Sequence, residues 1–141
     1  MLQKSIRFAV ILSLFVYANA FANDNQSKKE CIENNLLMGL ETANSGLQLS
    51  CAYYLGELKT QAAVLPLMNL LRSAKDDNLK IVAALSLIKI GDERGVFLVE
   101  RTSIFDDSEA VRKMSNRFYI AFRYAKVDKP TDFQEIFAMI K

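Results

Sequence analysis

Apolar residues along this chain recur at a constant interval of about 32 residues, which is called the repeat length below. Four positions take part in the first recurrence, namely Leu47, Leu55, Leu58 and Val64, which return as Leu79, Leu87, Ile90 and Val96. The first three return again as Val111, Tyr119 and Phe122. A unit of this length holds two helices, which cannot bury their apolar sides alone. The pattern therefore predicts a stack of helical hairpins.

Within each unit, apolar residues follow the helical period between polar turns. The first predicted helix follows Ser27 and stops at the turn 44–46. Pro66 is tolerated because it falls in an opening turn, and Ser108 is a suitable N-cap. The remaining predicted helices span about 47–58, 62–74, 81–90, 94–104 and 108–126.

The segment from Ile81 to Ile90 is apolar nearly all the way round its circumference. Such a helix is buried on several sides, which is expected in the middle of a three-layer stack. Gly91 then supplies a C-terminal stop.

A last amphipathic segment begins at Pro130 and carries Phe133, Ile136, Phe137 and Ile140 on one side. Since an end repeat must cover an otherwise exposed apolar face, this segment is predicted to be a cap. The complete prediction is an all-α fold, a short right-handed α-solenoid of about three helical-hairpin repeats with a C-terminal capping helix. The predicted repeats span about 28–58, 61–91 and 93–126, and the cap spans 130–141.

Positions 1–22 have the pattern of a secretory signal peptide. Lys4 and Arg7 precede a short apolar run, and small residues follow at the positions that a signal peptidase reads. Cleavage is predicted after Ala22, with Ala20 as the alternative site. The apolar run is about half of the ~20 residues that a membrane-spanning helix needs. The expectation is a domain over residues 23–141, periplasmic or secreted, with no membrane span after cleavage.

Composition excludes several kinds of chemistry. The chain has no histidine, which excludes Ser-His and Cys-His triads and the commonest zinc sites. Two carboxylate pairs, at 76–77 and 106–107, lack the further oxygen ligands of a calcium loop. Without Lys4 and Arg7 the basic and acidic residues balance, so nucleic acid is not an expected partner. No metal and no cofactor are predicted.

Cys31 and Cys51 would meet an oxidising compartment, where pairing is common. In an antiparallel hairpin turning near residues 44–45, however, Cys51 lies opposite Met38, about 10 Å along the axis from Cys31. We therefore predict no intrachain disulfide, with Cys51 as a buried free thiol and Cys31 exposed enough for an intermolecular bridge.

At this point the residues resemble a known family, the HEAT-like repeat in its short bacterial form. The resemblance is carried by GLQLSCAYYLGEL at residues 46–58, AVLPL at 63–67 and DDSEAVR at 106–112, and it covers about residues 28–126. It implies a binding or scaffolding role with no intrinsic activity, in which the inner helices line a concave binding face. Some relatives are phycobilin lyases, but a signal peptide and only three repeats argue against that role here.

The family resemblance also implies that a turn Asp and an inner-helix Arg tie adjacent layers together. Only the third repeat has both, as Asp107 and Arg112; the second repeat has Asp77 with Lys80, and the first has Asn44 with Gln48.

One side of the sixth predicted helix carries an arginine–tyrosine stripe, consisting of Arg112, Asn116, Tyr119 and Arg123. We predict that this stripe faces away from the core and that Lys80 and Gln48 extend the same surface. Arginine beside an aromatic ring suits a carboxylate, a phosphate or a sugar acid. The alternative is a solvated face with Arg112 paired to Asp107.

Two further groups have an ordinary structural explanation beside a functional one. Tyr53 and Tyr54 on the second helix are expected to fill space between layers, although they could line a recognition surface. Ser86 and Lys89 could in principle form a nucleophile and base, but nothing in the sequence builds an oxyanion hole.

These observations predict a non-catalytic module of the cell envelope that binds a protein or peptide or serves as a scaffold. Lys113, Arg117 and Lys126 make the C-terminal third basic, which favours an acidic partner. The alternative is an envelope protein that binds a small anionic ligand or glycan on its inner face.

Overall fold

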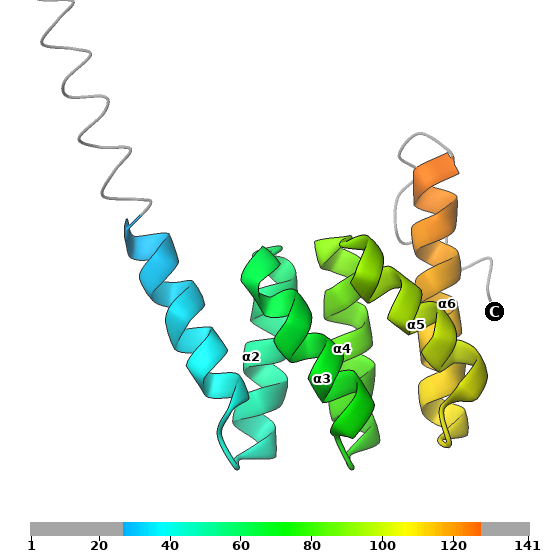
Figure 1. The fold of residues 1–141 in the computed structure, drawn as a ribbon, viewed down its shortest axis with the longest axis horizontal. Helices are drawn as coiled ribbons and strands as arrows, with labels where there is room; N and C mark the ends of the chain where they lie inside the picture. Colours follow the sequence, from blue (N-terminus) through cyan, green and yellow to red (C-terminus); the bar gives the residue numbers. More distant parts are fainter. Residues whose placement is uncertain (1–26, 128–141) are drawn as a thin grey trace, which may run out of the picture. The chain divides into compact units, whose positions relative to one another are not determined.

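The computed structural model of the protein describes residues 27–127, and all regular structure in this range is helical. Residues 27–40 are helical, and five α-helices follow. These are α2 (Ser45–Glu57), α3 (Val64–Ser73), α4 (Asp77–Ile90), α5 (Glu93–Phe105) and α6 (Glu109–Val127), with a 3-10 turn η1 (Gln61–Ala63) before α3 (Figure 1). The predicted signal peptide and the predicted cap lie outside the described residues.

The chain divides into two compact units, with the boundary between Asn35 and Leu36. In the first unit, residues 27–35 are helical, and Ile32 has 53% of its surface exposed. The second unit contains the end of this first helix, residues 36–40, and all of the later helices. The second unit holds residues 36–126 of the predicted repeats, whereas residues 28–35 of the predicted first repeat belong to the first unit.

Short polar side chains cap α2, α4, α5 and α6, and Ser108 is the one of these caps that is predicted from the sequence. Ser108 Oγ accepts a hydrogen bond from the Val111 amide at 3.4 Å, which confirms it as an N-cap. Asp76 Oδ1 accepts from the Asn78 amide at 2.9 Å, and Gly91 ends α4 with a φ of 76°. Helices α2 and α4 begin earlier than predicted. Asn44 caps α2 through the Leu47 amide, so α2 begins at Ser45 rather than at Leu47. With Asp76 as its cap, α4 begins at Asp77 rather than at Ile81.

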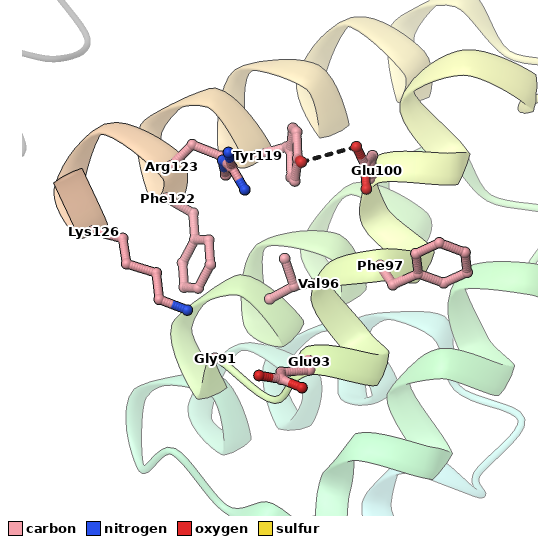
Figure 2. A pocket seen from close by; sticks show the side chains of 9 residues that line it. All are labelled: Gly91, Glu93, Val96, Phe97, Glu100, Tyr119, Phe122, Arg123 and Lys126. Carbon is pink, nitrogen blue, oxygen red and sulfur yellow. Dashed lines mark hydrogen bonds between the residues drawn. The ribbon is translucent and has the colours of Figure 1, made fainter.

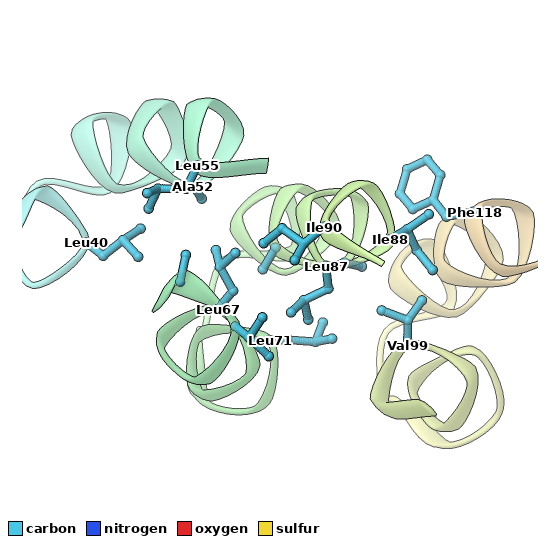
Figure 3. Close-up of a cluster of buried hydrophobic side chains, with 14 of the residues drawn as sticks. Leu40, Ala52, Leu55, Leu67, Leu71, Leu87, Ile88, Ile90, Val99 and Phe118 are labelled. Atoms are coloured by element: carbon cyan, nitrogen blue, oxygen red, sulfur yellow. The ribbon is translucent and has the colours of Figure 1, made fainter. Parts of the chain in front are cut away.

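Helix α4 is the centre of the second unit because it packs on α2, α3, α5 and α6. Leu87 and Ala84 in α4 are fully buried, and Leu67 of α3 and Leu55 of α2 pack in the same cluster (Figure 3). Burial of each leucine side chain contributes about 1.5–3 kcal/mol. The all-α fold and the short α-solenoid of helical hairpins are thus confirmed, with α4 as the buried middle helix.

Helices α2 and α4 approach each other closely at Gly56. A Cβ atom built on Gly56 would lie 2.7 Å from both Cα and Cβ of Ser86, closer than real side chains come. One turn away, Ser86 Oγ donates a hydrogen bond to the Ala52 carbonyl at 2.7 Å in the buried interface. The absence of a side chain at residue 56 therefore sets the spacing of the two helices.

Replacing Gly56 with Ala is expected to lower the free energy of unfolding by about 1–3 kcal/mol, because the methyl group overpacks this contact. Gly46→Ala in the same helix is the matched control. Its Cβ would meet only Asn44 Oδ1, at 3.4 Å, so it should be neutral or stabilise by up to about 1 kcal/mol. Urea unfolding followed by circular dichroism measures both variants. Equal midpoints would contradict the close packing of α2 on α4.

Candidate functional site

Three of the predicted surface residues are engaged within the protein. Gln48 Nε2 donates to the Leu40 carbonyl at 2.8 Å, and Lys80 Nζ lies 2.8 Å from Asp106 Oδ2. Arg112 Nη1 donates to the carbonyl oxygens of Asp106 and Asp107. These three residues occupy the same position in successive repeats, each one repeat length after the last. In the structure their polar groups hold the turns between helices.

The tie between the second and third repeats differs from the predicted Asp–Arg pair. Arg112 bonds to the main chain of the turn rather than to the Asp107 carboxylate, so the predicted Arg112–Asp107 pairing is wrong. The layers are joined instead by the Lys80–Asp106 ion pair and by Ser108 Oγ, which donates to Asp77 Oδ2 at 2.5 Å. Asp106 is suited to this role because its side chain is only 10% exposed and also accepts from the Ser108 amide.

The rest of the arginine–tyrosine stripe does not form one free surface. The Tyr119 hydroxyl donates to Glu100 Oε1 at 2.8 Å (Figure 2). The Tyr119 ring packs against the core. The prediction that Tyr119 faces away from the core is therefore wrong. The hydrogen bond to the Glu100 carboxylate raises the pKa of Tyr119. Asn116 and Arg123 are exposed, and the binding role of the stripe stays a prediction.

Replacing Lys80 with Met is expected to lower the free energy of unfolding by about 1–2 kcal/mol, because it leaves Asp106 without its ion-pair partner. This loss lies between those typical of exposed and of fully buried ion pairs. The control is Lys75→Met, an exposed lysine just before α4, which should change stability by less than about 0.5 kcal/mol. A double-mutant cycle with Asp106→Asn, measured by urea unfolding, isolates the pair. A coupling energy of zero would show that this contact does not join the layers.

The exposed side of α2 and α4 carries a tyrosine–lysine cluster, consisting of Tyr53, Tyr54, Glu57 and Lys89. Tyr53 and Tyr54 are 40% and 56% exposed, so the expectation that they fill space between layers is wrong. Their rings meet edge to face at 5.6 Å, and Lys89 Nζ lies 4.7 Å from the centre of the Tyr53 ring. Lys89 also forms an ion pair with Glu57 across the two repeats. The cluster is thus an ordered aromatic and charged surface.

Hydrogen bonds within the cluster shift two pKa values in opposite directions. The hydrogen bond from Lys89, followed by that from the Tyr53 hydroxyl, lowers the pKa of Glu57. The same Glu57 carboxylate raises the pKa of Tyr53, because losing the phenolic proton would place a second negative charge beside it. Glu57 is therefore ionised and Tyr53 neutral at physiological pH.

A groove of about 360 Å³ lies beside this cluster, at the C-terminal ends of α2, α4 and α6. We call it the inner groove; its lining consists of Gly56, Glu57, Lys59, Ile88, Lys89, Phe122 and Ala125. Apolar side chains from α4 and α6 form one part of the lining, and two lysines with one glutamate form the other. Such a mixture suits an extended or helical peptide that carries both apolar and charged groups.

Lys59 holds an unusual backbone conformation at the edge of the inner groove. Its φ is 53°, in the left-handed region that favours glycine. Its amide donates to Gly56 and the Thr60 amide donates to Leu55, which completes a Schellman turn at the end of α2. The equivalent position in the next repeat is Gly91, which adopts the same region without a side chain. Lys59 therefore adds a positive charge to the inner groove at a position where the next repeat has glycine.

Sequence reasoning missed Glu57, Lys59 and their relation to Lys89, although a signal was present. Glu57 and Lys89 are separated by the repeat length, so opposite charges occupy the same position in adjacent layers. Neighbouring layers bring such positions together. The same spacing relates Lys59 to Gly91. A lysine at a turn position where the next repeat has glycine is therefore visible in the sequence.

The cysteines are free thiols, as predicted: Cys31 is exposed and Cys51 is buried. Burial raises the pKa of the Cys51 thiol. A Cβ atom built on Gly39 would overlap Cys51 Sγ, so Cys51 packs against Gly39. The predicted position of Cys51 is opposite Met38, one residue earlier.

Neither a metal-binding cluster nor a membrane-spanning helix is found within residues 27–127. No group of three or more acidic, cysteine or histidine side chains is placed to hold a metal ion there. Nor is any helix in this range both long enough and apolar enough to span a bilayer.

Comparison with known families identifies the repeat. Residues 47–73, from α2 into α3, match the family model of the PBS lyase HEAT-like repeat. No curated protein gives a significant match to the chain. HEAT-like repeats are typically protein-interaction or scaffold modules, and the lyase in the family's description does not make the repeat itself catalytic.

Proposed function

We propose that this chain, in which residues 47–73 match a HEAT-like repeat, is a non-catalytic module that binds a protein or peptide partner in the inner groove. The observation that carries this proposal is the exposure of Tyr53 and Tyr54 beside the Lys89–Glu57 pair. Large aromatic side chains with a fixed charged neighbour are the residues that dominate binding energy at protein interfaces. Ion pairing and ring contacts hold Tyr53 and Lys89 in place, which reduces the entropy lost on binding.

The charge around the inner groove supports an acidic partner. Lys59 and Lys89 line the groove, and Arg117 holds the position in α6 that Tyr53 holds in α2. Glu57 is the one acidic residue of the lining, and it is already paired with Lys89. An approaching carboxylate would therefore meet a net positive surface.

The proposed site of action is the cell envelope. The basic start, short apolar run and small residues of positions 1–22 support export by their agreement with a secretory signal. A partner would then be an envelope or secreted protein.

Selection from a random peptide library against the chain without residues 1–22 tests the proposal. We expect enrichment of peptides that combine aspartate or glutamate with an aromatic or aliphatic residue. Binding of an enriched peptide, followed by fluorescence anisotropy, should weaken about tenfold or more in Tyr53→Ala and in Lys89→Met, as for residues at the centre of an interface.

The matched control is the double variant Leu65→Ala with Arg101→Ala, which removes an exposed apolar and an exposed basic side chain from α3 and α5. It should bind the peptide as the unaltered chain does. Arg123→Ala tests the predicted arginine–tyrosine stripe in the same assay and should also have no effect. Equal binding by all variants, or loss of binding only with Arg123→Ala, would overturn the assignment to the inner groove.

A further inference from the structure

No further helical layer follows the third repeat among residues 27–127. Comparing the burial of equivalent residues in the second and third repeats shows which part of the third repeat lacks a covering layer. Val64 and Ile88 of the second repeat are 0% and 4% exposed. Their counterparts one repeat length later, Val96 and Ile120, are only half-buried. By contrast, Val111, which is equivalent to the buried Leu79, is itself 0% exposed. Apolar burial is thus incomplete on one side of the third repeat.

Polar residues already occupy part of this open side. Asn116 and Ser103 stand at the positions where the second repeat has the buried residues Ala84 and Leu71. Both lie away from the C-terminal end of α6, in the half of the hairpin near the turn between α5 and α6. Ile104 and Phe105, at the end of α5 in this half, are nevertheless 61% and 72% exposed. The half-buried Val96 and Ile120 lie in the other half.

That other half contains a cavity of about 210 Å³ between α5 and α6, which we call the end cavity. Figure 2 shows Val96 and Phe122 lying between the two helices, with Arg123 and Lys126 on the α6 side. Phe97 on α5 lines the same cavity and is 60% exposed. The cavity has an apolar floor, with two basic residues on the α6 side and two glutamates, Glu93 and Glu100, on the α5 side.

We propose that residues 130–141 of this chain occupy the end cavity and cover the open side of the third repeat. α6 ends at Val127, directly after Lys126, which lines the cavity. The chain that follows therefore starts at the edge of the site. Its apolar residues have helical spacing, and a helix of this segment would be about 18 Å long, enough to cover the exposed half of a hairpin.

Charge is complementary in the same arrangement. The segment carries Asp132 and Glu135 near its start, and the cavity edge nearest the end of α6 carries Arg123 and Lys126. Glu93 and Glu100 line the opposite, α5 side of the cavity, so the complementary charge lies at the α6 edge. A short connection, 128–129, keeps the segment at high effective concentration beside the cavity. The same segment on a second copy of the chain would lack this advantage.

Hydrogen exchange measured by mass spectrometry on the chain without residues 1–22 tests the proposal. The double variant Phe133→Asp with Phe137→Asp should speed exchange of residues 93–100 and 119–126 by about tenfold or more, as expected when a covering segment is released. Gln134→Asp with Ala138→Asp is the matched control, because it adds the same two charges at the same spacing on the other side of the segment. The control should exchange as the unaltered chain does.

A chain ending at Val127 provides the second arm. It should show the same fast exchange at the end cavity, and a synthetic peptide of residues 128–141 added to it should restore protection. Equal exchange in both double variants, or no restoration by the peptide, would overturn the proposal. Protection that rises with protein concentration in the unaltered chain would instead assign the cavity to a second copy. Phe122 and Ala125 of the inner groove lie within residues 119–126, but residues 93–100 contain none of its lining, and no peptide partner is added in this experiment. The two proposals can therefore fail separately.

Discussion

The close contact of α2 with α4 at Gly56 and Ser86 sets the spacing on which the other layers depend. Because residue 56 has no side chain, the two helix backbones approach until the Ser86 hydroxyl reaches the Ala52 carbonyl. α4 then presents its remaining sides to α3, α5 and α6. The inner groove lies at the end of the same contact, since Gly56 is part of its lining. Both the packing around α4 and the position of the inner groove therefore depend on the spacing between α2 and α4.

Much of the fold could be predicted because the repeat imposes the same burial on equivalent residues. Leu55 and Leu87 are one repeat length apart and are both fully buried, and α4 is buried on several sides as its composition indicates. The buried Cys51 and the capping Ser108 also follow from local rules. These features depend on helical periodicity and turn chemistry, which act over a few residues and can be read directly from the sequence.

The candidate site was harder to predict because it depends on which polar groups find partners inside the protein. Arg112 and Lys80 look like free cations on a helix face, but both reach the turn at residues 106–107. Tyr119 has a partner on α5, whereas Tyr53 and Tyr54 stay exposed. Helical spacing gives the side of a helix on which a residue lies, and it does not give the length of side chain needed to reach a neighbouring turn.

The central claim is that α4 is the most stable element because it packs against four other helices, α2, α3, α5 and α6. Native-state hydrogen exchange at increasing denaturant tests this claim most directly. The amides at the middle of α4, around Leu87, should exchange only through global unfolding, while those at the C-terminal end of α6 open with a lower free energy. Exchange of the α4 amides at or below the opening free energy of α2 and α6 would contradict the account.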